Sequence, residues 1–484
     1  MWPISHSSLS EFKIMNQKSA QLFLSVLAFL FLTIAHVTAA GPAEVGWDTM
    51  ASILSRIKAP EFPACDFEIS KFGAVAGGPD CTDAIYRAIV ECNKAGGGRV
   101  VVPAGVWHTG AIHLLSNVNL YVSEGATLKF NPDTQKYLPV VFTRIGGIEC
   151  FNYSPLIYAF EQENIAVTGK GTLDGGASME NWWSWTKRGK KAAEGQASGK
   201  YLDDLVKRGV PVKERVLGAS QYHRPNFVQP VRCRNVLIDG LTINNSPNWE
   251  INPVYCINVT VRNLKIETHG PNNDGCDPDS CRDVLIENCL FDTGDDCIAI
   301  KSGINDDGRR VGIPCENIII RDCFMKDGHG GVVLGSEVAG DVRNVFVENC
   351  RMDSPSLDRA FRFKSNAQRG GVLENVFARN VQIGRVAEAI VTVDFLYAEG
   401  ANGPYKPVVR NVHLENITSE SSPRVLWIVG FPGAVVDGLE FVNCTFKGVE
   451  TAEVVTSAAD VRFKNTTIEP AKKKRSLNSP GATP

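Results

Sequence analysis

The sequence predicts an all-β chain that winds as a parallel β-helix, a solenoid of short strands, with a short N-terminal capping helix. Strand motifs recur every 23 to 36 residues between residues 235 and 444, as in Asn235-Val-Leu-Ile-Asp239 and Asn344-Val-Phe-Val-Glu-Asn-Cys350. Most copies are bounded by Asn or Asp, whose side chains make turn hydrogen bonds. One such strand cannot bury its face alone, so the copies must stack on their neighbours. Long amphipathic helical windows, which an alternating βα fold needs, are missing between the copies.

The first forty residues have the order of a secretory signal peptide. Two lysines precede an apolar run from Leu22 to Ile34, and small residues follow it up to Ala40. The apolar run is shorter than the ~20 residues of a membrane span. We therefore expect residues 1–40 to be a cleaved leader and residues 41–64 to be an N-terminal extension. The mature protein is expected to be secreted into the extracellular space or cell wall, with no membrane partner.

Sequons of the form Asn-x-Ser/Thr fit this route and predict a glycoprotein. They begin at Asn152, Asn244, Asn258, Asn416, Asn443 and Asn465.

Residues 65–470 are expected to form a single β-helix domain. Its first element is a helix over residues 83–94, which Thr82 or Asp80 can cap and which ends at Gly96-Gly97-Gly98. Strands follow from Arg99 onwards. A helix in this place covers the open end of the coil and protects its edge.

The repeat pattern lapses over residues 177–225, a polar and basic segment that contains tryptophans. An excursion of this length in a solenoid is typical of a functional loop or lid. The tail over residues 471–484 is rich in Lys, Ser and Pro and is expected to be disordered.

Fourteen cysteines in an oxidising compartment permit disulfides. Cys289, Cys323, Cys350 and Cys444 occupy the same slot of the repeat. Pairs at zinc-ligand spacing are missing, and Cys buries readily, so the pattern favours an inward stack of small side chains. We assign no metal and no cofactor. The net charge of −3 provides no basic field for nucleic acid.

Charged residues fall into register when the repeats are aligned. Gly294-Asp295-Asp296 begins five residues after Cys289, and Gly328-His329-Gly330 begins five residues after Cys323. Equal slots on successive coils lie about 4.8 Å apart. Asp295 is therefore expected directly beside His329.

A second alignment uses the serines that close the next strand, Ser280, Ser302, Ser336 and Ser365. It places Asp274 beside Asp296, and it places Arg362 and Lys364 on the same face. Packing three carboxylates together raises the pKa of at least one of them. A glycosidase needs this asymmetry, because one carboxyl donates a proton to the leaving oxygen while another activates water. His329 is placed to tune or relay the proton, and the two cations are suited to gripping a substrate carboxylate.

These segments resemble the four ordered signatures of glycoside hydrolase family 28, the polygalacturonases. They are Asn272-Asn273-Asp274, Gly294-Asp295-Asp296-Cys297, Gly328-His329-Gly330 and Arg362-Phe363-Lys364. The similarity extends from Phe72-Gly73-Ala74 to the segment that ends at Tyr397. The resemblance implies a right-handed, pectin-lyase-like β-helix and hydrolysis of α-1,4-linked galacturonan, the pectin backbone, with inversion.

The resemblance also implies roles for individual residues. Asp295 would donate the proton, Asp274 and Asp296 would hold the attacking water, and His329 would support the donor. Arg362, Lys364 and Tyr397 would bind the sugar next to the cut, and Asn272 is counted among the substrate-binding residues. Two positions depart from the family pattern, Asn273 in place of Thr and Phe363 in place of Ile, which leaves the detail of the subsites open.

Other readings remain open at this point. The nearest is a family member acting on xylogalacturonan or rhamnogalacturonan, although the Arg362 and Lys364 pair favours galacturonate. A lyase would need calcium ligands and a basic proton abstractor, and a non-catalytic pectin-binding protein would have no need of all three aspartates.

Exo cutting is favoured over endo cutting, because the excursion at 177–225 is long enough to wall off one end of a groove. Trp182, Trp183 and Trp185 could stack on sugars or could anchor the loop, and Arg224 could meet a terminal carboxylate. A monomer is expected.

Overall fold

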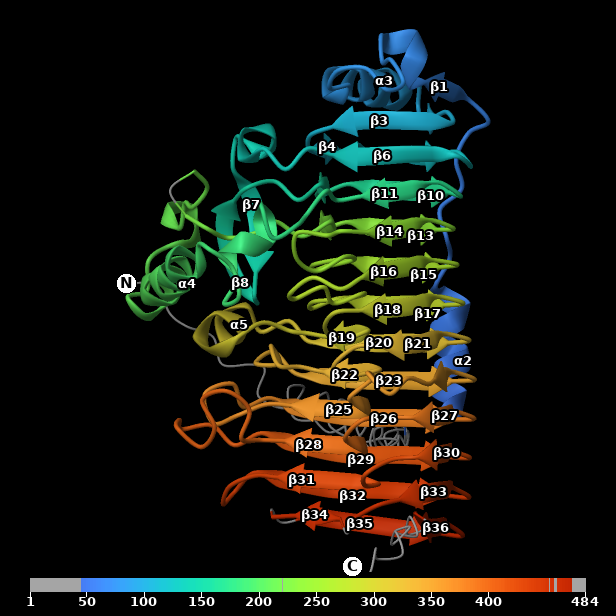
Figure 1. Ribbon diagram of the computed structural model, residues 1–484, viewed down its shortest axis with the longest axis vertical. Helices are drawn as coiled ribbons and strands as arrows, with labels where there is room; N and C mark the ends of the chain where they lie inside the picture. Colours follow the sequence, from blue (N-terminus) through green and yellow to red (C-terminus); the bar gives the residue numbers. More distant parts are fainter. Residues whose placement is uncertain (1–44, 220, 452, 457–458, 472–484) are drawn as a thin grey trace, which may run out of the picture. The chain divides into compact units, whose positions relative to one another are not determined.

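The protein is a right-handed parallel β-helix (Figure 1), as predicted. The computed structural model describes residues 45–219, 221–451, 453–456 and 459–471. The expected leader over residues 1–40 and all but the first residue of the expected tail lie outside the described residues. Strands of the coil run from Asp66 to Pro470, so they fill the stretch that the sequence assigns to the solenoid.

Three long faces of parallel strands form the coil. The first face has thirteen strands: β1 (Asp66–Glu68), β2 (Gly98–Val102), β5 (Val118–Val122), β10 (Glu163–Gly169), β13 (Arg234–Asp239), β15 (Ile257–Arg262), β17 (Arg282–Glu287), β20 (Cys315–Arg321), β23 (Val342–Glu348), β26 (Val372–Arg379), β29 (Val408–Glu415), β32 (Val435–Val442) and β35 (Ala459–Lys464).

The second face has twelve strands: β3 (Gly105–Thr109), β6 (Ala126–Phe130), β11 (Thr172–Asp174), β14 (Thr242–Asn244), β16 (Lys265–Thr268), β18 (Leu290–Thr293), β21 (Phe324–Asp327), β24 (Arg351–Met352), β27 (Gln382–Arg385), β30 (Thr418–Ser421), β33 (Thr445–Val449) and β36 (Thr467–Pro470).

The third face lies beside the charged cluster that the sequence predicts, and its strand β25 (Arg359–Lys364) contains Arg362 and Lys364. Its strands are β4 (Ile112–His113), β9 (Ile157–Phe160), β12 (Val228–Val231), β19 (Ile298–Ile300), β22 (Val332–Leu334), β25 (Arg359–Lys364), β28 (Ala389–Asp394), β31 (Leu426–Val429) and β34 (Val454–Val455). Single bridges through Ile251 and Cys276 join β12 to β19. The third face is therefore continuous from coil to coil.

Asparagines at the heads of the strand motifs explain why the motif repeats. Asn344, Asn375 and Asn411 have φ of 59°, 58° and 54°, in the left-handed region that asparagine tolerates better than other side chains. The amide of Asn375 donates to Asn344 Oδ1 at 3.0 Å, and that of Asn411 donates to Asn375 Oδ1 at 2.7 Å. Each asparagine thus turns its own coil and ties it to the coil before.

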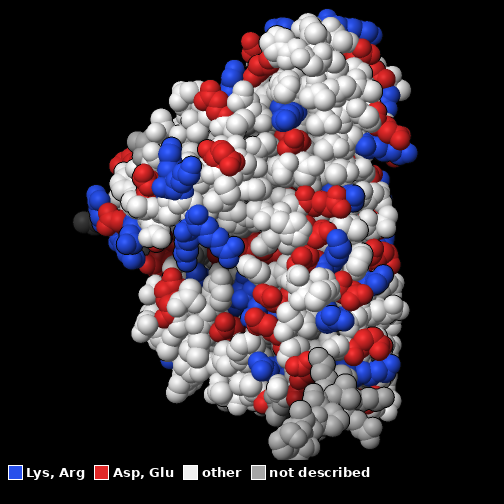
Figure 2. Space-filling view, viewed as in Figure 1, with Lys and Arg blue, Asp and Glu red and all other residues white. Residues whose placement is uncertain are grey.

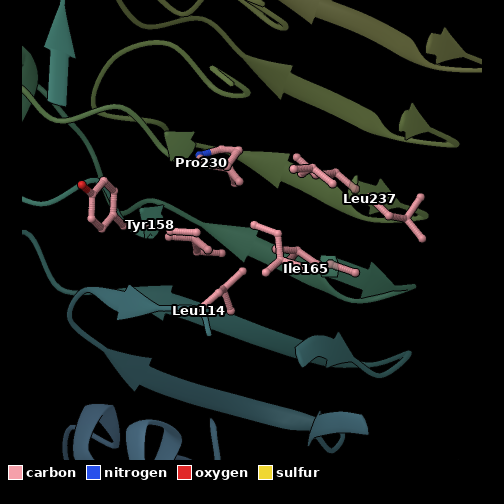
Figure 3. A pocket seen from close by; sticks show the side chains of 12 residues that line it. Leu114, Tyr158, Ile165, Pro230 and Leu237 are labelled. Atoms are coloured by element: carbon pink, nitrogen blue, oxygen red, sulfur yellow. The ribbon is translucent and has the colours of Figure 1, made fainter. Parts of the chain in front are cut away.

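The interior of the coil is apolar and closely packed. Figure 3 shows this interior where Leu114, Ile165 and Pro230 approach one another from successive coils. The space left between them is about 10 Å³, at or below the ~10–15 Å³ that one water needs. The ring of Tyr158 lies at the rim, and its hydroxyl donates to the Phe142 carbonyl at 2.6 Å.

The fourteen cysteines all lie in the described residues, and none is paired in a disulfide. The disulfides that the sequence permits are therefore not formed in this structure. Cys289, Cys323, Cys350 and Cys444 are each no more than 2% exposed, which agrees with an inward stack. One sequon is also incompatible with glycosylation in the folded protein, because Asn152 is fully buried and its amide donates to the His223 carbonyl.

Helix α3 (Thr82–Lys94) caps the N-terminal end of the coil, as expected (Figure 1). The N-cap is Cys81, which makes no side-chain capping bond, so neither candidate occupies that position; Asp80, one residue earlier, accepts a hydrogen bond from Thr82 N at 2.9 Å. The short helical segment η1 (Ile69–Phe72) packs against α3.

Helix α2 (Trp47–Arg56) lies in the expected N-terminal extension, where the sequence indicated no element. It packs outside the first face, against β17 and β20. Arg56 forms an ion pair with Asp283 at 2.8 Å, and the guanidinium of Arg379 lies 3.9 Å from the Trp47 ring centre.

Beside the third face lies a lateral unit built from several inserted segments (Figure 1). It comprises η2 (Thr134–Tyr137), the antiparallel hairpin of β7 (Val141–Ile145) and β8 (Ile148–Asn152), η3 (Trp182–Trp185), α4 (Ala192–Lys207) and η4 (Val212–Glu214). The short helix α5 (Asn305–Val311) leaves the coil to meet it. The sequence placed a loop at residues 177–225 but indicated neither α4 nor α5. None of the helices in the described residues is long and apolar enough to cross a bilayer.

Buried ion pairs fasten the lateral unit to the coil. Arg144 of the hairpin is fully buried and pairs with Asp279 at 2.8 Å. Arg215 pairs with Asp307 of α5 at 2.6 Å. A buried charge without a partner is costly, so these pairs fix where the unit sits beside the third face.

Candidate active site

The aspartates of the predicted cluster lie in the segments that lead into the third face. Asp274 follows β16, while Asp295 and Asp296 lie between β18 and β19. Gly275 N donates to the Asp296 carbonyl at 3.0 Å, so the two segments run side by side. One carboxylate oxygen from each of the three residues lies within 4.8 Å of the others. The stacking of coils thus brings together the three carboxylates that the alignment selected.

His329, between β21 and β22, lies on the next coil beside Asp295. Its Nδ1 is 2.9 Å from Asp295 Oδ1, and its backbone N–H donates to the Asp295 carbonyl at 3.0 Å. The hydrogen bond to Asp295 raises the pKa of His329, against the lowering effect of burial. Burial alone would raise the pKa of Asp295, but the hydrogen bond and charge of His329, with Lys364 and Lys301, hold it at about 2. In the free protein this pair therefore carries one proton on the imidazole.

Asp296 is held by two cations from β25. Lys364 Nζ lies 2.5 Å from Asp296 Oδ2, and Arg362 Nη1 lies 3.5 Å from Asp296 Oδ1. The register Val333↔Arg362 places β25 directly after β22 in the stack. Arg362 and Lys364 are 9% and 5% exposed, so both cations lie at the floor of the site. The ring of Tyr397 lies beside them, 5.7 Å from the Arg362 guanidinium and 5.4 Å from the Lys364 ammonium.

Asp274 is buried and occupies a different electrostatic environment. Its pKa is raised well above the ordinary value, first by burial and then by the charges of Asp277 and Asp295. Its Oδ1 and Oδ1 of Asp296 are both buried and have no hydrogen-bond partner among the described residues. Two such oxygens on adjacent segments form a pair of acceptors for one small donor.

Asn272 and Arg224 belong to one hydrogen-bonded chain that ends at Asp295. Arg224 Nη2 donates to Asn272 Oδ1 at 2.7 Å, and Asn272 Nδ2 donates to Asp295 Oδ2 at 3.4 Å. Nη1 of Arg224 donates to the carbonyls of Pro247 and Pro271. The Arg224 guanidinium is thus engaged with the protein, and the residue also lines a cavity beside Asp295, so its contact with a terminal carboxylate stays a prediction.

The two departures from the family pattern have structural explanations. Asn273 is fully buried and shapes the turn before Asp274, since its Oδ1 accepts from Gly270 N and Thr268 Oγ1, both at 2.7 Å. Phe363 is 2% exposed and faces the interior of the coil. Neither side chain is directed at the carboxylates.

A cavity of about 700 Å³ opens between the lateral unit and the coil, and Asp295 and His329 lie in its wall. Trp183, Lys187 and Arg188 line it from the insertion. Figure 2 shows Lys and Arg side chains gathered over the inserted segment on this face. The cavity therefore combines an aromatic surface with positive charge beside the aspartates.

The three tryptophans of η3 have different roles. Trp182 and Trp185 are 1% and 9% exposed, and they pack on each other with ring centres 4.9 Å apart, so they anchor the insertion. Trp183 donates through Nε1 to the Ser246 carbonyl at 2.9 Å and lines the cavity. It packs so closely on Gly270 that a Cβ there would lie 2.3 Å from its ring.

Sequence reasoning missed a second set of charged residues, Lys301, Asp277 and Glu337. Lys301 is 2% exposed and lies 3.5 Å from Asp274 Oδ2. A signal was available, because Lys301 directly precedes Ser302, one of the serines used to align the coils. A lysine that follows the buried run Ile298-Ala299-Ile300 needs a carboxylate nearby.

Comparisons with known proteins agree with this geometry. The model of the family described as glycosyl hydrolases family 28 matches residues 214–459. A probable polygalacturonase of Vitis vinifera is 26% identical over 82% of this chain and 78% of its own length. An exo-poly-α-D-galacturonosidase of Dickeya chrysanthemi is 28% identical over 83% of this chain and 70% of its own length.

Among solved structures, a hyperthermoactive exopolygalacturonase from Thermotoga maritima is 42% identical, with a TM-score of 0.84, over 88% of this chain and 96% of its own. The family match takes in every residue of the carboxylate cluster and the cations beside it. This chain therefore belongs to glycosyl hydrolases family 28 and is a glycosidase.

Proposed function

We propose that this chain is a polygalacturonase that hydrolyses the α-1,4-galacturonosidic bonds of pectin. One observation carries the proposal: three carboxylates lie within 4.8 Å of one another, beside His329 on one side and two buried cations on the other. The carboxylates supply the acid and the base of glycoside hydrolysis. The cations favour a sugar that bears a carboxylate. The names of the relatives, all galacturonan hydrolases, support the same substrate.

In the proposed mechanism, Asp295 donates a proton to the leaving oxygen and His329 supplies it through their shared hydrogen bond. Substrate binding would exclude water and bring a further carboxylate to the site, and both effects raise the pKa of Asp295 toward that of the imidazole. The proton then lies nearer the oxygen that needs it. Arg224 and Asn272 keep the second oxygen of Asp295 oriented.

Asp274 and Asp296 would hold the attacking water between their Oδ1 atoms, which lack hydrogen-bond partners among the described residues. Lys364 and Arg362 fix the position of the Asp296 carboxylate, so it orients the water. Asp274 accepts the proton of the water as the bond breaks. Its raised pKa makes Asp274 a good proton acceptor once it is ionised.

This arrangement leads to inversion at the anomeric carbon. Inverting sites usually separate their carboxyls by ~6.5–9.5 Å and retaining sites by ~5–5.5 Å. Stacking on neighbouring coils predicts a spacing near the short end, and oxygens within 4.8 Å agree with it. We nevertheless propose inversion, because the two Oδ1 atoms without hydrogen-bond partners among the described residues suit a water, and Lys364 pairs with Asp296 Oδ2. Early proton NMR of the products tests it: the β-anomer is expected first, and an initial α-anomer would mean retention.

We also propose exo cutting. The lateral unit lines one side of a cavity of about 700 Å³ next to Asp295, which supports a site that is walled on that side. The end of a galacturonan chain can enter a space that is walled on one side, whereas endo cutting needs a groove that is open at both ends so that the polysaccharide can lie across it. Viscosity of polygalacturonate measured against reducing-end release decides between the two modes. Slow viscosity loss is expected, and a steep loss at very low bond cleavage would mean endo cutting.

Residues 65–470 are proposed to be a single catalytic domain. The protein is proposed to be secreted, with cleavage of the leader at about Ala40. The leader-like composition of residues 1–40 supports this route. N-terminal sequencing of protein recovered from the culture medium of a eukaryotic host should give a start near residue 41. A start at Met1, or retention in the cell, would contradict the proposal. Light scattering of the mature protein should give the mass of a monomer.

A further inference from the structure

A buried lysine lies next to the proposed base. Lys301 directly follows β19 and is in register with Asp279 of the preceding coil. Its ammonium is 3.5 Å from Asp274 Oδ2, 3.6 Å from Asp277 Oδ2 and 3.2 Å from Glu337 Oε2. Carboxylates from the coil before Lys301 and from the coil after it thus converge on one cation.

Lys301 cannot reach a substrate. The residue is 2% exposed, and its ammonium lies 4.3 Å from the ring centre of Trp249, which closes its remaining side. A cation so enclosed has a fixed position and a fixed charge. Its influence on the reaction must pass through the carboxylates that it contacts.

The carboxyls around Lys301 differ in charge state. Burial raises the pKa of Asp277 to about 8, although Lys301 opposes this effect. Both of its oxygens are buried without a hydrogen-bond partner among the described residues, and the same holds for Glu250, whose pKa burial also raises. Glu337 is ionised, because Lys301, Arg369 and Lys364 outweigh its burial and hold its pKa at about 2. Lys301 and Glu337 therefore form the charged pair, next to groups that tend to keep their protons.

Asp274 is influenced from every side of this cluster. Asp277, Asp295 and Asp296 oppose its ionisation, whereas Lys301 favours it. Arg224 lies on the cavity side and is also coupled electrostatically to Asp274. Of these cations, Lys301 is the one that forms an ion pair with Asp274. Without Lys301, burial and three neighbouring carboxyls would act on Asp274 with little opposition.

We infer that Lys301 is a positioning residue of the hydrolytic site, which holds the Asp274 carboxylate in place and favours its ionised form, the form that can take a proton from the attacking water. This inference rests on the proposed function. It assigns a role to a buried residue that does not line the cavity beside Asp295. It also predicts that Lys301 acts on the acid limb of the pH–rate profile, since Asp274 must lose its proton before the reaction.

The test compares Lys301→Met and Lys301→Arg with the wild type on polygalacturonate between pH 3 and pH 8. Removing an opposite charge within ~4–6 Å raises a carboxyl pKa by about one to three units. The acid limb of kcat should therefore move to higher pH by at least about one unit in Lys301→Met, with kcat below the limb reduced about tenfold per unit. KM should change by less than about threefold, because the residue lies away from the substrate. Lys301→Arg should keep the acid limb near its wild-type position.

The variant Glu337→Gln provides an independent test, which can still be carried out if Lys301→Met fails to fold. Removing the ionised partner of Lys301 leaves its charge to Asp274, so the acid limb should move to lower pH. Opposite shifts in the two variants cannot arise from general loosening of the fold. Lys326→Met is the matched control, because its ammonium pairs with Asp292 at 2.5 Å outside this cluster; its acid limb should not move.

The outcomes separate this inference from the proposed function. If the wild type releases no reducing ends from polygalacturonate, the proposed function fails and the inference fails with it. If the wild type is active and the acid limb stays in place in folded Lys301→Met, or in Glu337→Gln, the inference alone is overturned.

Discussion

Replacing His329 by Gln tests how the proton reaches the leaving oxygen. Gln is similar in size and can still donate a hydrogen bond to Asp295, but it cannot carry a proton. His329 Nδ1 is 2.9 Å from Asp295 Oδ1, and the imidazole is half exposed, so the substitution should leave the fold intact. The change therefore isolates the titration of the imidazole from its packing.

The size of the effect follows from the two pKa values. In the wild type the pair keeps its proton up to the pKa of His329, which the hydrogen bond to Asp295 raises above 6.5. In His329→Gln the proton must reside on Asp295 alone. The pKa of Asp295, about 2 beside the imidazolium, should then rise to or somewhat above the ordinary aspartate value of about 4. The alkaline limb should fall by at least about two pH units, which at pH 7 corresponds to about a 100-fold loss of rate.

The raised pKa of His329 also determines how the substitution changes stability with pH. A histidine with a raised pKa in the folded state stabilises the protein fully below about pH 6.5, and this contribution is lost as pH rises through the folded pKa. His329→Gln should therefore lower the melting temperature at pH 5 and leave it unchanged at pH 9. Thermal melts at the two pH values measure this difference.

The assay is the initial rate of reducing-end release from polygalacturonate between pH 3 and pH 9. His269→Gln is a closely matched control: its Nε2 is 2.9 Å from Asp292 Oδ1, and its side chain is 54% exposed against 52% for His329. The control should keep the alkaline limb in place. An alkaline limb in His329→Gln that coincides with that of the wild type would refute the shared-proton reasoning.

Three further predictions follow from the same geometry. Asp295→Asn cannot donate a proton, so kcat should fall at least about 100-fold while calorimetry still detects binding of a galacturonate oligomer; a variant that keeps more than about a third of the wild-type rate would remove Asp295 from the donor role. Methyl esterification removes the charge that Arg362 and Lys364 would bind, and each charge-assisted hydrogen bond is worth about 1.5–3 kcal/mol. Highly esterified pectin should therefore be a poor substrate. Equal rates on esterified and de-esterified pectin would contradict that role. Arg144→Leu leaves the buried Asp279 carboxylate unpaired, so denaturant unfolding should report a loss of about 3–5 kcal/mol at neutral pH, and a loss under about 1 kcal/mol would show that the pair does not fasten the lateral unit.

The fold and the main cluster could be predicted from the sequence because a solenoid converts sequence register into spatial register. Once the repeats were aligned on Cys289 and Cys323, the position of Asp295 beside His329 followed from the stacking distance alone. The aligned serines did the same for Asp274 and Asp296. Few folds allow this, because in most folds the separation of two residues in sequence does not determine their distance in space.

The parts that could not be predicted lie where the chain leaves the repeat. Helix α4 has no strand motif to align with, and the insertion that contains it is joined to α5 by the ion pair of Arg215 and Asp307, which are distant in sequence. Arg224 was expected to face the substrate because its residue type suits a carboxylate. The backbone carbonyls that engage it could be known only from the folded chain. Lys301 is an intermediate case, since its register was available but its three carboxylate partners made sense only once they were seen together.

The stacking of coils gives the two carboxyls that would transfer protons, Asp295 and Asp274, different neighbours. Asp295 lies next to His329 on the following coil, whereas Asp274 pairs with the buried Lys301. One carboxyl is coupled to an exposed base and the other to a buried cation, so their environments differ although their oxygens are within 4.8 Å. The resulting pH–rate profile should be bell-shaped, with Asp274 and Lys301 setting the acid limb and His329 setting the alkaline limb. Because the asparagine ladders and the apolar interior stabilise the coil elsewhere, the crowding of like charges at this one place is compatible with a stable fold.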